Sequence, residues 1–122
     1  MDFEYFYGKQ SSQYAFYRIQ KQLFMESQFN TLSVGAKLLY GMMIDRMELS
    51  QKNGWIDGHG RAYIYVTVDE VKDKFHCAND KAVKLMEELD SDKGIGLIKS
   101  VRQGLGKPNI IYVKNFVSSP QA

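Results

Sequence analysis

The longest helical pattern lies in residues 33–50, where apolar residues recur every three or four positions. Ser33 is placed to cap the start of this helix. One apolar stripe is expected to face the core: Ala36, Leu39, Tyr40, Met43 and Met47. A second stripe runs beside it: Leu38, Met42 and Leu49. Because two stripes exceed what a small core usually needs, the second either adds to the core or meets another subunit.

Two shorter helices are predicted downstream. The segment Thr67-Val68-Asp69-Glu70 fits a capping box, so a helix is expected over residues 68–75. A tight connection at 76–78 leads to the next helix, which Asn79 is expected to cap and which ends near residue 89. The buried stripe of this last helix is expected to be Ala82, Leu85, Met86 and Leu89.

Strands are predicted where side chains alternate in character or apolar runs lie between turn residues: at 14–19, 63–66, 95–101 and 109–113. Gly104 and Gly106 lie between the last two segments, which indicates a hairpin with a flexible tip. A brief helix is expected around residues 21–26. Aromatic residues crowd the chain before that helix: Phe3, Tyr5, Phe6, Tyr7, Tyr14, Phe16 and Tyr17.

This order of elements predicts an α+β fold, a winged helix-turn-helix with an aromatic-rich N-terminal extension. We expect residues 1–32 to form an N-terminal arm, with a short strand and a helix packed on the main domain. Residues 33–117 are expected to form the winged-helix domain, and residues 118–122 a tail or the start of a linker. The aromatic arm and the second stripe of the long helix are expected to help pair two subunits.

Composition narrows the class of protein. A chain of 122 residues with 44% hydrophobic residues suits one globular domain, here expected to be part of a longer protein. The sequence contains no run of 18 apolar residues, so no membrane-spanning helix is predicted. The N-terminal segment carries acidic residues where a secretion signal would carry basic ones. The single cysteine, Cys77, excludes an internal disulfide framework, so we expect a cytoplasmic location.

Charge is distributed unevenly. Residues 93–122 carry five basic residues and no acidic one, which indicates a polyanionic partner. In a winged helix, the helix after the turn lies in the major groove of DNA and the hairpin reaches toward the minor groove. The candidate DNA-binding residues are therefore Thr67, Asn79, Asp80, Lys81, Lys84, Arg102, Gln103 and Lys107.

Each candidate also has a structural explanation. Asn79 caps its helix whatever else it does, and Lys81 and Lys84 are equally compatible with an ordinary solvated face. Asn pairs well with adenine, and Lys with guanine or phosphate. Asp80 repels phosphate, so it either accepts from a cytosine amine or only complements the helix dipole. Thr67 is placed to bind a phosphate through its hydroxyl or the neighbouring N–H groups.

The sequence offers little for catalysis. His76 and Cys77 are adjacent, and adjacent residues rarely orient their side chains for proton transfer. Two histidines and one cysteine at these spacings make no zinc site. The segment 104–107 is too short for a phosphate-binding loop. We therefore expect neither an enzyme nor a bound cofactor or metal.

Several stretches together are similar to a known family. They are Phe16–Ile19, Ala36–Gly41, Lys52–Asp57, Tyr63–Tyr65, Asp80–Leu85, Lys93–Ile98 and Gly104–Phe116. In this order they resemble the N-terminal domain of the RepA_N-type plasmid replication initiators of Gram-positive bacteria, including staphylococcal ones. The resemblance covers most of residues 3–117.

The resemblance implies a winged-helix domain that binds repeated double-stranded sites at a plasmid origin, as a homodimer. It implies that the Lys81–Lys84 helix and the Arg102–Lys107 wing touch DNA. It also implies a separate C-terminal domain, outside this sequence, that engages host replication proteins. Two other functions stay open from the residues alone: a winged-helix transcriptional repressor, and a winged helix used for protein–protein contact.

Overall fold

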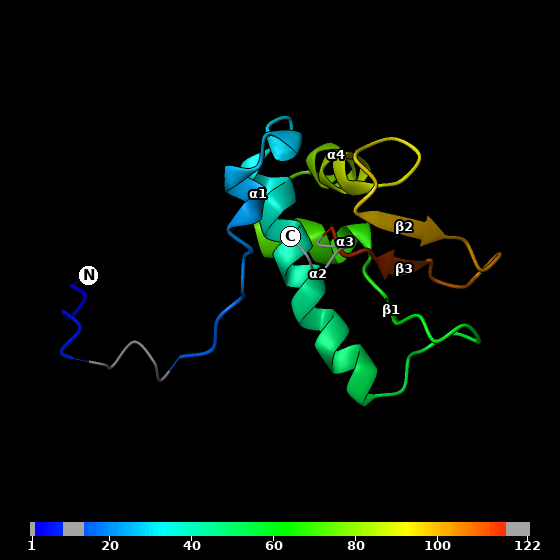
Figure 1. Cartoon of the computed structure of the whole chain (residues 1–122), viewed down its shortest axis with the longest axis horizontal. Helices are drawn as coiled ribbons and strands as arrows, with labels where there is room; N and C mark the ends of the chain where they lie inside the picture. Colours follow the sequence, from blue (N-terminus) through cyan, green and yellow to red (C-terminus); the bar gives the residue numbers. More distant parts are fainter. Residues whose placement is uncertain (1, 9–13, 117–122) are drawn as a thin grey trace.

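The computed structural model describes residues 2–8 and 14–116, and its helices surround one side of a small sheet (Figure 1). In chain order, the helices are α1 (Gln22–Met25), the 3-10 helix η2 (Ser27–Phe29), α2 (Val34–Lys52), α3 (Val68–Phe75) and α4 (Asn79–Leu89). The strands are β1 (Tyr63–Ile64), β2 (Ile98–Val101) and β3 (Ile110–Val113), in the spatial order β1-β3-β2 with antiparallel pairs. This arrangement confirms the predicted winged helix.

Helix α2 is the axis of the core and begins where the sequence predicts. The Ser33 hydroxyl accepts the backbone N–H of Ala36 at 3.1 Å, as an N-cap should. Four residues of the expected first stripe are buried, and Met47 is only half-buried. Every other element also contributes buried side chains, and the largest fully buried ones are Tyr40, Phe29, Leu23, Met43, Ile64, Leu85, Leu89, Ile98, Ile111 and Val71. The second stripe is not core, because Leu38 and Leu49 are 40% and 57% exposed.

Helices α3 and α4 form the helix-turn-helix. The capping box is present as predicted: the Thr67 hydroxyl accepts the Glu70 N–H, and the Glu70 carboxylate accepts the Thr67 N–H. His76 adopts a left-handed backbone with φ 50°, which ends α3 and turns the chain.

The predicted cap of α4 is wrong by one residue. Ala78 holds the extended cap conformation, and its carbonyl accepts the first intrahelical bond from the N–H of Ala82. Asn79 is therefore the first helical residue. The sequence favoured asparagine because its side chain caps well, but the left-handed turn at His76 brings the chain into the helix one position earlier.

The sheet is shorter than the sequence predicts. Strand β2 starts at Ile98 because the chain first turns back on the end of α4, with the Ile95 N–H donating to the Glu88 carbonyl at 2.9 Å. A Cβ on Gly94 would collide with the carbonyls of Glu87 and Glu88, so this turn requires glycine. On the apolar face of the sheet, Ile64 of β1 lies opposite Ile111 of β3, and both are buried.

The N-terminal arm differs most from expectation. Within the described residues, segment 14–19 forms no strand, because no other strand lies beside it to complete a ladder. In the later part, Leu23 and Phe29 are buried, Phe24 is 54% exposed, and Ile19 lies over Gly41. The aromatic side chains before it are 49–86% exposed: Phe3, Tyr5, Phe6, Tyr7, Tyr14, Phe16 and Tyr17. The predicted tail over 118–122 lies outside the described residues.

None of the helices in the described ranges is long and apolar enough to span a bilayer.

Candidate nucleic-acid interface

The candidate interface combines α4 with the β2–β3 hairpin. The two are joined directly: Asp90, which follows α4, bridges to Ile98 of β2, and the Ser91 hydroxyl donates to the Ile98 carbonyl at 2.8 Å. In Figure 1 the hairpin starts beside α4 and its tip extends away from the helices. The turn at Gly94 therefore fixes how the wing leaves the helix-turn-helix.

Helix α4 presents a polar face to solvent. Ala82, Leu85 and Leu89 are buried against the core, as predicted, and Met86 is half-buried. The residues of the opposite face are exposed: Asn79, Asp80, Lys81 and Lys84. This separation follows from the helical period, which sends the apolar and charged side chains of one short helix to opposite sides.

The shifted cap changes the chemistry of Asn79. Within residues 2–8 and 14–116, its side-chain amide makes no hydrogen bond, because capping has passed to Ala78. The amide therefore keeps both a donor and an acceptor for an external partner. Asp80 lies beside it in the first turn of α4, where its charge complements the helix dipole.

The wing holds its three candidate side chains at the ends of an open loop. Arg102, Gln103 and Lys107 are exposed. The Gln103 amide donates to the Pro108 carbonyl at 2.8 Å and ties the base of the loop together. Gly104 and Gly106 adopt φ angles of 123° and 78°, which other residues reach only with strain.

The four candidate cations of α4 and the wing form no ion pair within the described residues. The ion pairs found in the described ranges are Arg46–Glu70, Arg61–Asp57, Lys72–Asp69 and Lys93–Glu87. Within the same ranges Lys81, Lys84, Arg102 and Lys107 have no acidic partner. Their charge is therefore available to an anion from outside the chain.

Thr67 is placed less favourably than the sequence analysis supposed. Its hydroxyl already accepts the Glu70 N–H at 3.1 Å in the capping box. Two carboxylates, Asp69 and Glu70, stand in the same helical turn and disfavour a phosphate there. A phosphate contact at Thr67 remains a prediction.

Sequence reasoning missed the contacts that hold these elements in place. The Glu88 carboxylate of α4 accepts both the N–H and the hydroxyl of Ser33, at 2.8 and 2.7 Å, and so clamps α4 to the start of α2. The Arg46 guanidinium of α2 donates to the Tyr65 carbonyl and to the Glu70 carboxylate, at 2.7 and 2.6 Å. No local pattern indicates such pairs, because their members are 19 to 55 positions apart.

A third such contact centres on Asp57, in the loop before β1. Its carboxylate accepts the backbone N–H groups of Arg61 and His59, the Arg61 guanidinium and the Tyr112 hydroxyl, each at 2.9 Å. The Arg61 N–H above all, with these other donors, holds the pKa of Asp57 well below its usual range. This ionised carboxylate anchors the loop to β3.

Across the described residues, no three histidine, cysteine or acidic side chains are grouped so that they could hold a metal ion. Cys77 is half-buried in the α3–α4 connection.

Comparison with known proteins gives this geometry a context. The family model described as the N-terminus of replication initiator protein A (RepA) matches residues 15–122. A 41 kDa protein of Lactobacillus helveticus is 28% identical over 94 residues. That match covers 77% of this chain but only 26% of the relative, so the chain spans about a quarter of that protein's length.

Three solved structures have the same fold. One, described as the N-terminal domain of a DNA-binding protein, is similar with a TM-score of 0.74 and 28% identity, over 98% of this chain and 88% of its own. A structure described as a Rep–DNA complex has a TM-score of 0.72 and 30% identity, and the match covers 92% of this chain and 84% of the other. A structure described as an MDR initiator has a TM-score of 0.70 and 29% identity, and the match covers 92% of this chain and 86% of the other. The winged-helix architecture is thus shared with these proteins.

Proposed function

Because the chain belongs to the RepA_N family of replication initiator N-terminal domains, we propose that it binds double-stranded DNA at repeated sites of a plasmid origin and so helps to initiate replication. The observation that carries the proposal is the set of four exposed cations on α4 and the wing, which lack acidic partners in the described parts of the chain. The similarity to a Rep–DNA complex supports the same conclusion.

The proposed contacts follow the chemistry of each side chain. Asn79 and Lys81, in the first turn of α4, face base edges in the major groove, and Lys84 contacts a guanine or a phosphate. Asp80 accepts from a cytosine amine if it meets a base. Arg102, Gln103 and Lys107 of the wing reach the neighbouring minor groove and its phosphates. This division requires α4 and the wing to face the same side of the duplex.

Three further features belong to the proposal. The domain acts by binding and carries out no catalysis of its own. It works in the cytoplasm as a homodimer, so that two copies meet two half-sites. Contact with host replication proteins belongs to a C-terminal region beyond this domain, in keeping with the quarter of the relative's length that the chain covers.

A salt titration of DNA binding tests the proposal. Footprinting on the plasmid that encodes the protein first locates the protected sites, and fluorescence anisotropy then measures affinity for a labelled duplex. With about six to ten phosphate contacts, affinity should fall by about 10³–10⁵ between 50 and 200 mM salt. Replacing Lys81, Lys84, Arg102 and Lys107 together by alanine should flatten this dependence.

The control is Lys52→Ala, which removes an exposed cation at the last residue of α2. This end of α2 lies far from α4 (Figure 1). A salt-independent affinity would refute DNA binding and leave a protein-interaction module. Protection at a promoter and not at an origin would instead identify a repressor.

A further inference from the structure

A pocket opens at the end of the sheet where β1 separates from β3. The two strands pair over only two residues each. In the described chain, Ala62 before β1 bridges to Ile56 and not to Val113, which would continue the ladder with β3. Ala62 and Val113 line the resulting pocket, which measures about 320 Å³. This volume falls within the range of about 300–1,000 Å³ that is typical of small-ligand sites.

The floor of this pocket, defined as Met47, Ala62 and Val113, is apolar, and its side chains are half-buried. These side chains can cover a flat apolar group, but they carry no strong hydrogen-bonding group that would select among such groups. Tyr112 adds an aromatic ring to the same lining. The floor therefore suits a planar ring system, whatever polar substituents the ring carries.

The rim of the pocket, defined as Arg61, Lys99 and Lys114, is entirely cationic. Arg61 precedes β1, Lys99 lies in β2 and Lys114 follows β3, and all three are exposed. None of the residues that line the pocket is acidic. Cations gathered around one concavity raise the local concentration of anions. Three of them match a ligand with more than one phosphate group better than a single carboxylate.

Arg61 is held in position without any ligand. Its Nε donates to the Asp57 carboxylate at 2.9 Å, and its guanidinium carbon lies 4.7 Å from the centre of the Tyr112 ring. Within the described residues its terminal nitrogens form no hydrogen bond, so they keep their donors for a phosphate. A side chain ordered in advance loses less entropy when it binds a ligand.

The two lysines of the rim keep their charge for an external anion. The Lys114 Nζ donates to the neutral Ser91 hydroxyl at 3.2 Å. Neither Lys99 nor Lys114 forms an ion pair in the described ranges. Asp57 therefore offsets one of the three rim charges, and two stay uncompensated.

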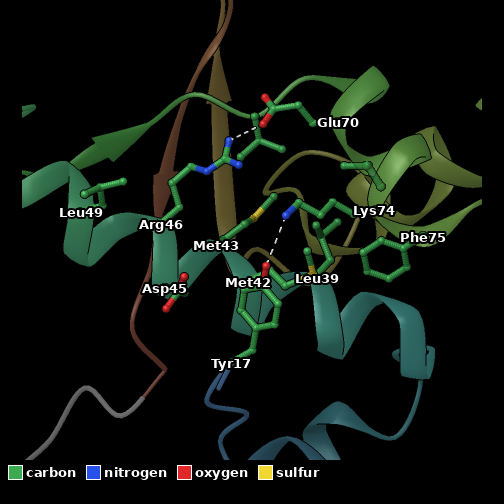
Figure 2. Close-up of a pocket in the computed structure, with 12 residues that line it drawn as sticks. Tyr17, Leu39, Met42, Met43, Asp45, Arg46, Leu49, Glu70, Lys74 and Phe75 are labelled. Carbon is green, nitrogen blue, oxygen red and sulfur yellow. Dashed lines mark hydrogen bonds and ion pairs between the residues drawn. The ribbon is translucent and has the colours of Figure 1, made fainter. Parts of the chain in front are cut away.

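A second cavity, between α2 and α3, shows by contrast what sets this pocket apart (Figure 2). It also holds two cations, but Arg46 donates to the Glu70 carboxylate at 2.6 Å. Lys74 donates to the Tyr17 hydroxyl at 3.4 Å, and Asp45 lines the same cavity (Figure 2). Two cations and two carboxylates leave that cavity without a surplus of positive charge.

We propose that the pocket between β1 and β3 binds a nucleotide with two or more phosphates, its base on the floor and its phosphates on the rim. The lining includes none of the side chains proposed to contact DNA. The inference thus adds a site for a small ligand and does not depend on the proposed function.

Isothermal titration calorimetry of the full chain with ADP, without DNA and without Mg²⁺, tests the site. We expect one ADP per chain. Lys99→Ala and Lys114→Ala should each weaken binding by about tenfold, because each removes a charge-assisted hydrogen bond to a phosphate. Lys99→Arg keeps the charge and should bind like wild type. The matched control, Lys74→Ala, removes a cation of the second cavity and should leave ADP binding unchanged.

Two further ligands identify the chemical class. GDP should bind as tightly as ADP, because the floor does not distinguish the bases, and a strong preference for one base would contradict this use of the floor. Inorganic pyrophosphate should bind more weakly, because it has no base to cover the floor. Equal affinity for pyrophosphate and ADP would overturn the nucleotide and leave a site for phosphates alone.

A last measurement keeps the pocket apart from the proposed DNA interface. ADP should bind the variant with alanine at Lys81, Lys84, Arg102 and Lys107, and it should still bind in the presence of the protected duplex. A chain that failed to bind DNA could still bind ADP, so the two proposals fail separately. Thermal melts confirm that the Lys99 and Lys114 variants are folded. No heat of binding at millimolar ADP, binding unchanged in both lysine variants, or displacement of ADP by the duplex would each overturn the inference.

Discussion

Tyr40 shows how one side chain closes the core against the C-terminal strand. It is 1% exposed, and its hydroxyl donates to the Lys114 carbonyl at 2.6 Å, just beyond β3. Burial raises the pKa of Tyr40 to about 12, because a phenolate would lose its hydration there.

We expect Tyr40→Phe to lower the free energy of unfolding at pH 7 by about 1–2 kcal/mol, since the Lys114 carbonyl loses the donor that reaches it from the core. The pKa of Tyr40 is raised on folding, so its contribution is full below about pH 10 and disappears as pH approaches 12. Urea unfolding of both proteins at pH 7 to 11.5 measures this. If the wild-type advantage did not shrink above pH 10, the assigned burial of the hydroxyl would be wrong.

The pKa of Asp57 is shifted in the direction opposite to that of Tyr40. Because its pKa is lowered in the folded state, its contribution is present above about pH 4 and is lost as pH falls further. Asp57→Asn should destabilise the domain at pH 7 and weaken the acid dependence of its unfolding. Thermal melts from pH 7 to pH 2.5 compare the two proteins. An acid dependence unchanged by the substitution would remove Asp57 as its source.

Lys84 and Arg102 carry the residue-scale prediction for DNA. Because both are exposed and lack an acidic partner in the described chain, Lys84→Ala and Arg102→Ala should leave the melting temperature unchanged. A base contact should cost about 1–3 kcal/mol of binding and relax specificity at one base pair, whereas a phosphate contact weakens all sequences alike. Anisotropy on the protected duplex and its single-base variants distinguishes the two. A sharp loss of stability would show that the residue is structural.

At the scale of elements, the turn between α4 and β2 decides where the wing points. A Cβ on Gly94 would collide with backbone carbonyls of α4, which cannot give way as a side chain does. Gly94→Ala should therefore destabilise the domain by about 1–3 kcal/mol. Gly58→Ala, where nothing lies within 4 Å, is the matched control. Chemical denaturation of both variants checks the difference, and equal stability would show that the turn yields easily.

The elements that the sequence predicts well depend on local signals. The bounds of α3 follow from the capping box, and α2 follows from the Ser33 cap and a long apolar period. Strand 14–19 fails because a strand needs a neighbour, which alternation within one segment does not reveal. Asn79 fails as a cap because its neighbour's backbone conformation, set by the turn at His76, decides where α4 begins.

The candidate site shows the same division. Exposure of the α4 and wing side chains follows from periodicity and from turn glycines, so it could be predicted. The Ser33–Glu88 clamp and the bond from Tyr112 to Asp57 could not, because each joins residues 55 positions apart in the chain. Those contacts set the orientation of the wing and helices, which the sequence leaves open.

For the whole molecule, the proposed homodimer would link stability to concentration. If folding and association are coupled, the melting temperature should rise by several degrees between about 1 and 100 µM, because mass action favours the associated folded state. Calorimetry at several concentrations measures the rise. A melting temperature that stayed constant over this range would contradict the proposed homodimer.

The bond from Gln103 to the Pro108 carbonyl has a consequence for how this protein can diversify. It closes the ribbon below residues 104–107, and Leu105 at the tip touches nothing in the described chain that would restrain its replacement. Mutations at Leu105 and Lys107 should therefore cost little folding free energy, as long as Gly104 and Gly106 are kept. Under the proposed function, related initiators could therefore acquire distinct DNA recognition through this tip alone, while the scaffold below it stays the same.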